Sequence, residues 1–113
     1  MQLEKSINYV MVSCTRKEPT RFEVFDMVNT VGIELTRSNK SGLLLDLSET
    51  LKPEEIIEAV KSGLRDRFPM LPHLYLGYSP CGENEEERVD SGFVIKCFSE
   101  TDMAREWLNS KVN

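Results

Sequence analysis

Long apolar stretches are missing from this sequence. No run approaches the roughly 18 consecutive apolar residues that a helix needs to span a bilayer, and the run Leu43–Leu45 is ended by Asp46. Residues 1–5 do not combine basic residues with a following apolar stretch, so they lack the pattern of a secretory signal peptide. The sequence therefore predicts neither membrane insertion nor a signal peptide.

Cysteine and histidine are scarce. Cys14, Cys81 and Cys97 are odd in number, widely spaced and without a CxxC pair, which argues against a disulfide framework and favours a cytoplasmic location. His73, the one histidine, is expected to begin a strand that Cys81 follows. About six strand residues, or roughly 20 Å, would then separate the two side chains. We therefore expect no Cys–His pair, no catalytic residue and no enzyme.

The sequence also lacks ligand spacings for metals and nucleotides. One histidine and scattered cysteines give no zinc pattern, and the acidic cluster at 83–87 lacks the glycine of a calcium loop. Residues 79–82 follow an expected strand, but they match neither GxxxxGK[ST] nor GxGxxG. No metal and no cofactor is expected.

Positive charge is in the minority. Lysine and arginine number 14 against 19 acidic residues, a net charge of −5, and residues 81–113 hold four basic and eight acidic residues. This balance argues against a nucleic-acid partner, which would need clustered Lys and Arg. The acidic segment at 83–90 is expected to be a solvated loop, with a docking strip for a basic partner as the alternative. A length of 113 residues fits one domain over 1–113.

What the sequence does contain is an alternation of strand and helix patterns. Runs typical of strands cover residues 7–15, 42–48, 73–79 and 92–98. A helix is expected after Thr20, because Thr20 and Glu23 have capping-box spacing and apolar residues then recur every three or four positions to Leu35. A second helix is expected from Pro53 to Phe68, where Pro69 stops it.

A third helix is expected after Ser99, which precedes Asp102 by three residues as a cap would; its apolar face would comprise Met103, Ala104, Trp107 and Leu108. The stretch 80–91 between the last two strands is expected to be a polar connection, with one helical turn as an option.

Strands that alternate with helices predict crossover connections, which make strands parallel and place helices on both faces. We therefore predict an α/β fold with a small mixed, mostly parallel sheet of four or five strands and helices on both faces. The alternative is an antiparallel, ferredoxin-like sheet covered on one face, because residues 31–36 also alternate like a strand.

Candidate binding residues follow from this fold, because ligands of parallel sheets collect at the carboxyl ends of strands. For Ser48, Thr50 and Ser99 the structural alternative is helix capping, and for Asp46 it is a carboxylate satisfied by backbone donors. The candidates are Asp46, Ser48, Glu49, Thr50, Ser79, Cys81 and Gly82, with Ser99 after the last strand.

The central run Gly42–Ser48 resembles the LLLDLS strand of STAS domains, named for sulphate transporters and anti-sigma-factor antagonists. The ending from Phe93 to Phe98, followed by Ala104, Trp107 and Leu108, is similar to that of the SpoIIAA-like branch. Element order and length agree over nearly the whole chain. The resemblance implies a small regulatory or interaction domain, since relatives bind partner proteins and some related folds hold nucleotides or lipids.

One departure from that family bears on function. In the phospho-switch members a D-S-S-G motif begins the helix after the D-L-S strand, and one of its serines accepts phosphate. Here that place holds Glu54, Glu55, Ile56 and Ile57, so no hydroxyl is present and phosphate cannot add its charge there. Glu55 could supply a fixed negative charge, or be an ordinary first-turn acid.

The sequence thus predicts a non-enzymatic regulatory or protein-interaction domain, binding a protein partner or itself, without the phospho-acceptor serine. The alternative is a small-molecule or lipid-binding domain with a cavity between helices and sheet. Four bulky residues motivate that alternative: Phe22, Phe25, Met27 and Phe68. A third class, a cysteine-dependent enzyme at Cys81, is the weakest.

Overall fold

One mixed sheet organises the chain, and the computed structural model describes it over residues 2–112. The elements in this range are β1 (Gln2–Lys5), β2 (Tyr9–Ser13), α1 (Arg21–Ser38), β3 (Gly42–Asp46), α2 (Pro53–Arg67), β4 (Leu74–Ser79), β5 (Arg88–Asp90), β6 (Phe93–Cys97) and α3 (Thr101–Lys111). The strand order is β1-β2-β3-β4-β6-β5. The pairs β2–β3, β3–β4 and β4–β6 are parallel, while β1 and β5 run antiparallel at the edges. The predicted α/β class and mostly parallel sheet are confirmed.

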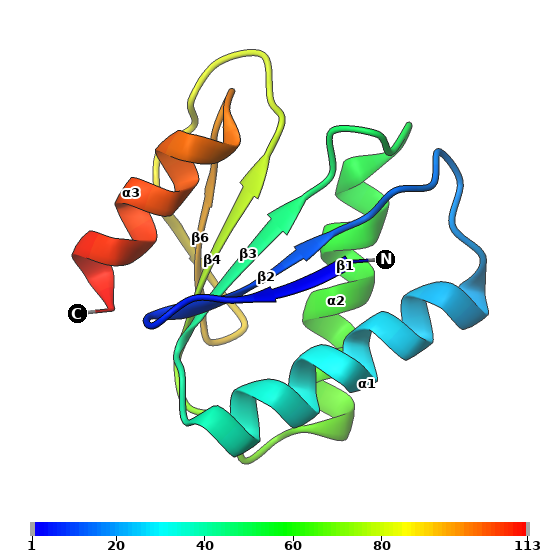
Figure 1. Cartoon of the computed structure of the whole chain (residues 1–113), viewed down its shortest axis with the longest axis vertical. Helices are drawn as coiled ribbons and strands as arrows, with labels where there is room; N and C mark the ends of the chain where they lie inside the picture. The colour runs from blue at the N-terminus through cyan, green and yellow to red at the C-terminus, as the bar shows by residue number, and fades with distance from the viewer. Residues whose placement is uncertain (1, 113) are drawn as a thin grey trace.

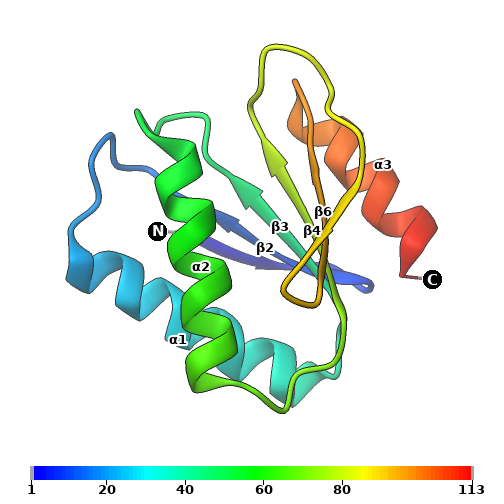
Figure 2. The ribbon, with the colours of Figure 1, turned by 180° about the vertical axis from the view of Figure 1, so that it is seen from behind.

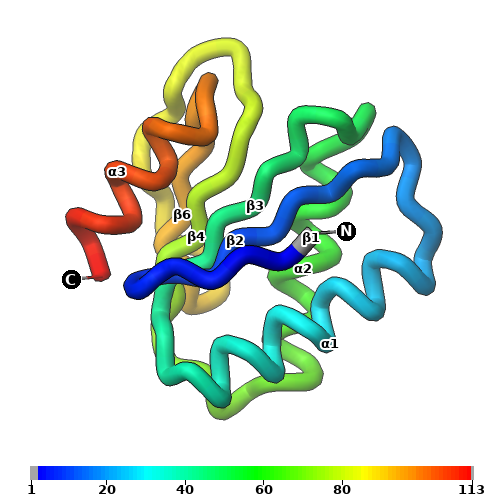
Figure 3. The backbone as a smooth tube through the Cα atoms, viewed as in Figure 1, coloured from blue at the N-terminus to red at the C-terminus, as the bar shows by residue number. Residues whose placement is uncertain are grey.

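The helices lie in two layers. Helices α1 and α2 cover one face of the sheet and α3 covers the other (Figure 1), as the view from behind also shows (Figure 2). Each crossover from β2 to β3 and from β3 to β4 passes over the same face, which is why α1 and α2 lie side by side (Figure 3). Within residues 2–112, no helix combines the length and the apolarity needed to cross a membrane.

The central strand β3 is buried from both sides. Leu43 and Leu45 belong to the core under α1 and α2, whereas Leu44 belongs to the core under α3. Successive strand residues point to opposite faces, so a sheet with helices on both faces needs a continuous apolar run rather than an alternating one. This is the physical reason that the Leu43–Leu45 run predicts the centre of the sheet.

The structure corrects the predicted strand number. Six strands are present in residues 2–112, more than the predicted four or five. The two that the sequence pattern does not indicate are β1 and β5. Both are short edge strands, and in β5 the burial pattern is exposed, exposed, intermediate. A strand that is mostly in water carries no buried apolar run, so it leaves little trace in the hydrophobic pattern. The helical-turn option within 80–91 is wrong, and residues 31–36 are helical, not strand.

Helix starts agree with expectation at α1 and α2 but not at α3. The Thr20–Glu23 capping box is present, and Pro53 occupies the first turn of α2. Ser99 is not a cap: Glu100 holds the N-cap position of α3, with no side-chain cap bond. Ser48 and Thr50 are not caps either, since Lys52 precedes α2 and its side chain makes no cap bond.

The capping box makes the start of α1 sensitive to acid. The Thr20 amide donates to Glu23 Oε1 at 3.0 Å, and this bond, with Arg16 nearby, holds the pKa of Glu23 below its usual range. A lowered folded pKa gives a stabilisation that is present above the unfolded pKa of about 4.3 and is lost as pH falls through the folded value. Urea melts should therefore show a smaller loss of stability between pH 6 and pH 3 for Glu23→Gln, which keeps the acceptor oxygen but cannot titrate. An unchanged pH dependence would contradict this role for Glu23.

Candidate functional site

The carboxyl ends of β2, β3, β4 and β6 meet at one edge of the sheet, the upper edge in Figure 1. Ser13, Asp46 and Ser79 are neighbours across this edge, because Ser13 pairs with Asp46 and Asp46 pairs with Ser79 in the parallel register. The structure therefore does bring Asp46 and Ser79 together, as the sequence predicted. The other candidates lie in the loops that leave this edge.

Asp46 makes a local bond rather than a ligand site. Its Oδ1 atom accepts the amide of Ser48 at 3.1 Å, which closes a turn directly after β3. Ser48 and Glu49 are exposed at the tip of that turn. The alternative given for Asp46, a carboxylate satisfied by a backbone donor, describes the structure.

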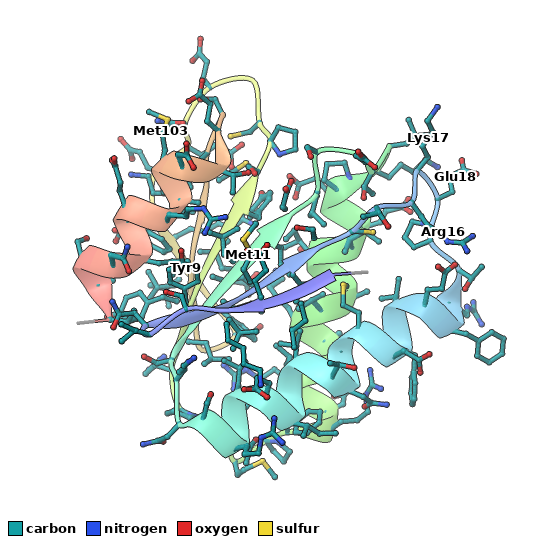
Figure 4. All side chains as sticks on the ribbon, in the orientation of Figure 1. Tyr9, Met11, Arg16, Lys17, Glu18 and Met103 are labelled. Carbon is teal, nitrogen blue, oxygen red and sulfur yellow. The ribbon has the colours of Figure 1, made fainter. Side chains whose placement is uncertain are left out.

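Thr50 holds two loops together. It is buried, and its Oγ1 atom donates to the carbonyl of Arg16 at 3.3 Å. The next amide, that of Leu51, donates to the carbonyl of Lys17 at 3.0 Å. These bonds attach the loop before α2 to the loop before α1, which is the segment labelled Arg16, Lys17 and Glu18 in Figure 4. Thr50 thus fixes the relative positions of the first turns of the two helices.

Ser79, Cys81 and Gly82 have three different environments. Ser79 is buried, and its Oγ atom lies 2.9 Å from Thr101 Oγ1, which attaches the end of β4 to the start of α3. Cys81 is half-buried and its side chain packs against the core under α1 and α2. Gly82 is exposed, and a Cβ added there would have no atom within 4 Å. These three do not form one pocket.

A cluster that the sequence did not reveal lies beside this edge. Tyr78, which is fully buried, donates from its hydroxyl to Glu54 Oε1 at 2.9 Å. Tyr78 is also the cross-strand partner of Cys97, and Cys81 packs against the core that contains both residues. We call Glu54, Tyr78, Cys81 and Cys97 the thiol–phenol cluster. Strand register could have paired Tyr78 with Cys97, but only the path of the following loop brings Cys81 to them.

Burial governs the protonation of this cluster. Desolvation raises the pKa of the Tyr78 phenol, and the hydrogen bond to Glu54 acts in the same direction. Desolvation also raises the pKa of the Cys97 thiol, reinforced by the neighbouring thiol of Cys81. Both groups are therefore neutral donors at physiological pH, which suits a structural contact or slow thiol chemistry rather than an activated nucleophile.

His73 and Cys81 lie at opposite ends of β4. His73 lies at the amino end of β4, where its Nδ1 atom is 3.0 Å from the carbonyl of Gly92, while Cys81 follows the carboxyl end of the same strand. Over residues 2–112, no three or more histidine, cysteine or acidic side chains gather in a way that could hold a metal ion.

A groove between α1 and α2 opens near the same edge. It has a volume of about 330 Å³ and is lined mainly by apolar side chains, with Arg21, Glu55 and Arg67 among its polar residues. We call it the α1–α2 groove; its apolar lining comprises Pro19, Val24, Phe25, Val28, Ile56 and Ala59. Of the predicted site residues, only Glu55 contributes to it. Glu55 is exposed, with Oε1 at 4.0 Å from Lys52 Nζ.

Phe22 and Phe25 do not line an interior cavity. Phe22 is 82% exposed and Phe25 is 50% exposed, and together with Arg21 they bound a second hollow of about 240 Å³ on the outside of α1. Met27 is buried, and Phe68 packs against the core. Sequence alone places an apolar residue on a helix but does not tell a core contact from an exposed anchor.

Two arginines, Arg21 and Arg67, line the α1–α2 groove. The guanidinium of Arg67 lies 3.9 Å from the ring centroid of Phe25 and donates to Asn29 Oδ1 at 2.9 Å. Within residues 2–112, no carboxylate oxygen lies within 4.0 Å of a nitrogen of Arg21 or Arg67. By contrast, Arg16 is paired with Glu23 at 2.7 Å.

Comparison with known protein families, curated proteins and solved structures finds no match to this chain. The resemblance to STAS domains therefore stays a prediction from the sequence.

Proposed function

We propose that this chain is a non-enzymatic protein-interaction domain that binds its partner through the α1–α2 groove. The observation that carries the proposal is the exposure of two aromatic side chains: Phe25, which lines that groove, and Phe22, which bounds the adjoining hollow that also includes Arg21 and Phe25. Large apolar side chains gathered beside a hollow are a feature of binding surfaces, whereas single exposed apolar residues are ordinary. The fold has no need of the Phe22 ring, which is 82% exposed.

The charges around the groove indicate the chemistry of the partner. The chain carries a net charge of −5, yet Arg21 and Arg67 present positive charge beside apolar side chains. Complementary potentials favour association and oppose wrong partners. We therefore infer a partner segment that combines apolar residues, for the groove, with carboxylates that pair with the two guanidinium groups.

Arg67 is held in place before a partner arrives. Its stacking on Phe25 and its bond to Asn29 fix the guanidinium. Gly63 of α2 leaves the space that this guanidinium occupies, because an added Cβ would lie 2.7 Å from Arg67 Nη2. A side chain that is already ordered loses less conformational entropy on binding. This favours Arg67 as a specific contact rather than an incidental surface charge.

Site-specific photocrosslinking tests the proposal in the organism that makes the chain. A photoreactive phenylalanine at position 22 should capture one protein partner, while the same group at position 33 should not. Ile33 is a matched control because it is 56% exposed on the same helix but lines neither the groove nor the adjoining hollow beside Phe22.

Binding of the identified, purified partner then gives the quantitative prediction. Phe22→Ala should weaken binding by about 30-fold, as expected for an aromatic anchor worth roughly 2 kcal/mol, and Arg21→Glu should weaken it about tenfold with a reduced salt dependence. Ile33→Ala should leave the affinity unchanged. Equal affinities for all three variants would refute the groove as the interface, and capture of a second copy of the chain at position 22 would replace the acidic partner by self-association.

The volume of the groove is the observation that favours a second function, the binding of a small molecule or lipid, and this function can be tested in parallel. About 330 Å³ lies at the lower end of the range for small-molecule pockets. The hollow lined by Cys14, Val24 and Met27 holds only about 20 Å³, room for little more than one water. Native mass spectrometry of the purified chain should show no retained small molecule or lipid. A retained ligand that Phe25→Ala releases would support the ligand-binding function instead.

A further inference from the structure

The loop after β4 encloses the end of β6 with two backbone bonds. The amide of Cys81 donates to the carbonyl of Phe98 at 3.1 Å, and the amide of Glu85 donates to the carbonyl of Cys97 at 3.0 Å. Residues 81–85 therefore lie directly against the segment that contains Cys97. This arrangement is independent of the α1–α2 groove, because neither cysteine lines it.

The two thiols of this loop and strand are neighbours that differ in accessibility. Cys97 is 1% exposed within the core under α1 and α2, and Cys81 packs against that core while remaining half-exposed. Cys81 reaches the core that contains Cys97 because its backbone is bonded to Phe98, the residue after Cys97, and its Sγ atom donates to the carbonyl of Glu83 at 2.9 Å. An accessible thiol beside a buried one is the arrangement in which the first can react with an oxidant and the second can resolve the product.

We propose that Cys81 and Cys97 form a reversible disulfide when the chain meets a low-molecular-weight disulfide such as glutathione disulfide. The Cys81 thiol loses its proton to solvent, and its sulfur attacks one sulfur of the oxidant, whose S–S bond breaks and releases one glutathione thiolate. The Cys97 thiol then loses its proton and attacks Cys81 Sγ, releasing the second glutathione thiolate. Two protein thiols are oxidised by two electrons, and one glutathione disulfide is reduced.

Two features of the site shape this reaction. Burial raises the pKa of the Cys97 thiol and keeps it protonated, which makes the second step slow. Formation of the bond would attach the loop 80–87 covalently to the end of β6. The segment that carries most of the acidic excess would then be held against the sheet.

Equilibration in glutathione redox buffers at pH 8, followed by acid quenching, alkylation and tryptic mapping, tests the proposal. We expect the wild type to lose two alkylatable thiols and to yield peptide 68–88 linked to peptide 97–105, with Cys14 still alkylated and the link reversed by dithiothreitol. Cys14 is the internal control, since it is also a buried cysteine, at the end of β2, with its thiol 3.8 Å from the carbonyl of Arg16.

Variants separate the two steps. Cys14→Ala should retain the linked peptide; Cys81→Ser should lose it and leave Cys97 alkylatable; and Cys97→Ala should stop at a glutathione adduct on Cys81. The wild-type map decides the question even where Cys97→Ala does not fold. A wild type that accumulates the Cys81 adduct with Cys97 free, or that links Cys14 to either residue, would overturn the proposal.

Discussion

Replacing Trp107 with alanine is expected to lower the free energy of unfolding by about 3–5 kcal/mol. The indole is 9% exposed and is the main side chain that α3 places on its face of the sheet. Its ring meets that of Tyr75 edge-on, at 6.0 Å between centroids, and that of Phe98 at 5.7 Å. Beneath it, Gly77 leaves the space that the ring fills, since an added Cβ would lie 3.4 Å from the indole.

Urea melts followed by far-UV circular dichroism measure this effect. A domain of this size has a total stability of about 5–15 kcal/mol, so Trp107→Ala could leave the chain largely unfolded at 25 °C. Trp107→Phe is the control: it retains a packed ring but removes the bond from Nε1 to Glu87 Oε1, 2.7 Å long, and should cost about half as much or less. A loss below about 1 kcal/mol for Trp107→Ala would show that the ring is not part of a core.

Gly92→Ala should lower the free energy of unfolding by about 2–4 kcal/mol, combining backbone strain with the loss of a charge-assisted bond. Asp90 pairs with Phe93, so Ser91 and Gly92 are the two turn residues between β5 and β6. Both have positive φ, 53° and 83°, as the two central residues of a type I′ hairpin turn require. At Gly92 a methyl group would also collide with the guanidinium of Arg65.

Displacing Arg65 would release the hairpin from α2. Arg65 donates from Nε to the carbonyl of Ser91 and lies 4.5 Å from the ring centroid of Phe93, while Lys61 of the same helix pairs with Asp90. Ser91→Gly is the matched control, because Ser91 shares the positive φ of Gly92 and glycine adopts that conformation without strain. The free energy of unfolding of Ser91→Gly should stay within about 0.5 kcal/mol of the wild type. Similar losses for the two variants in urea melts would contradict the assigned turn.

The helix and sheet layers could be predicted from the sequence because buried elements require characteristic patterns of apolar residues. The two-sided core of β3 requires the continuous run Leu43–Leu45, and the Thr20–Glu23 box marks a helix start through two specific bonds. What escaped prediction was mostly exposed. Strand β5 has no inward apolar run, and the sequence pattern places Ser91 at the end of the polar connection and Gly92 at the start of the next strand.

The candidate site was less predictable than the fold for a related reason. Strand register brought Asp46 beside Ser79 as expected, but the α1–α2 groove depends on how two helices cross, which periodicity does not encode. Phe22 and Phe25 have the same chemistry as core residues, so their exposure was not visible in the pattern. Cys81 reached Cys97 through the course of an irregular loop, for which no periodic signal exists.

The two faces of the sheet become covered at different times during translation. The core under α1 and α2 is built from residues between Val10 and Cys97, whereas on the other face Arg105 donates to the Tyr9 hydroxyl and the Met11 sulfur across 96 and 94 positions of sequence. A nascent chain therefore presents Tyr9, Met11 and Leu44 to solvent until residues 101–111 have left the ribosome. Contacts of such long sequence separation slow folding, and until they form, the apolar face that α3 covers is exposed to aggregation.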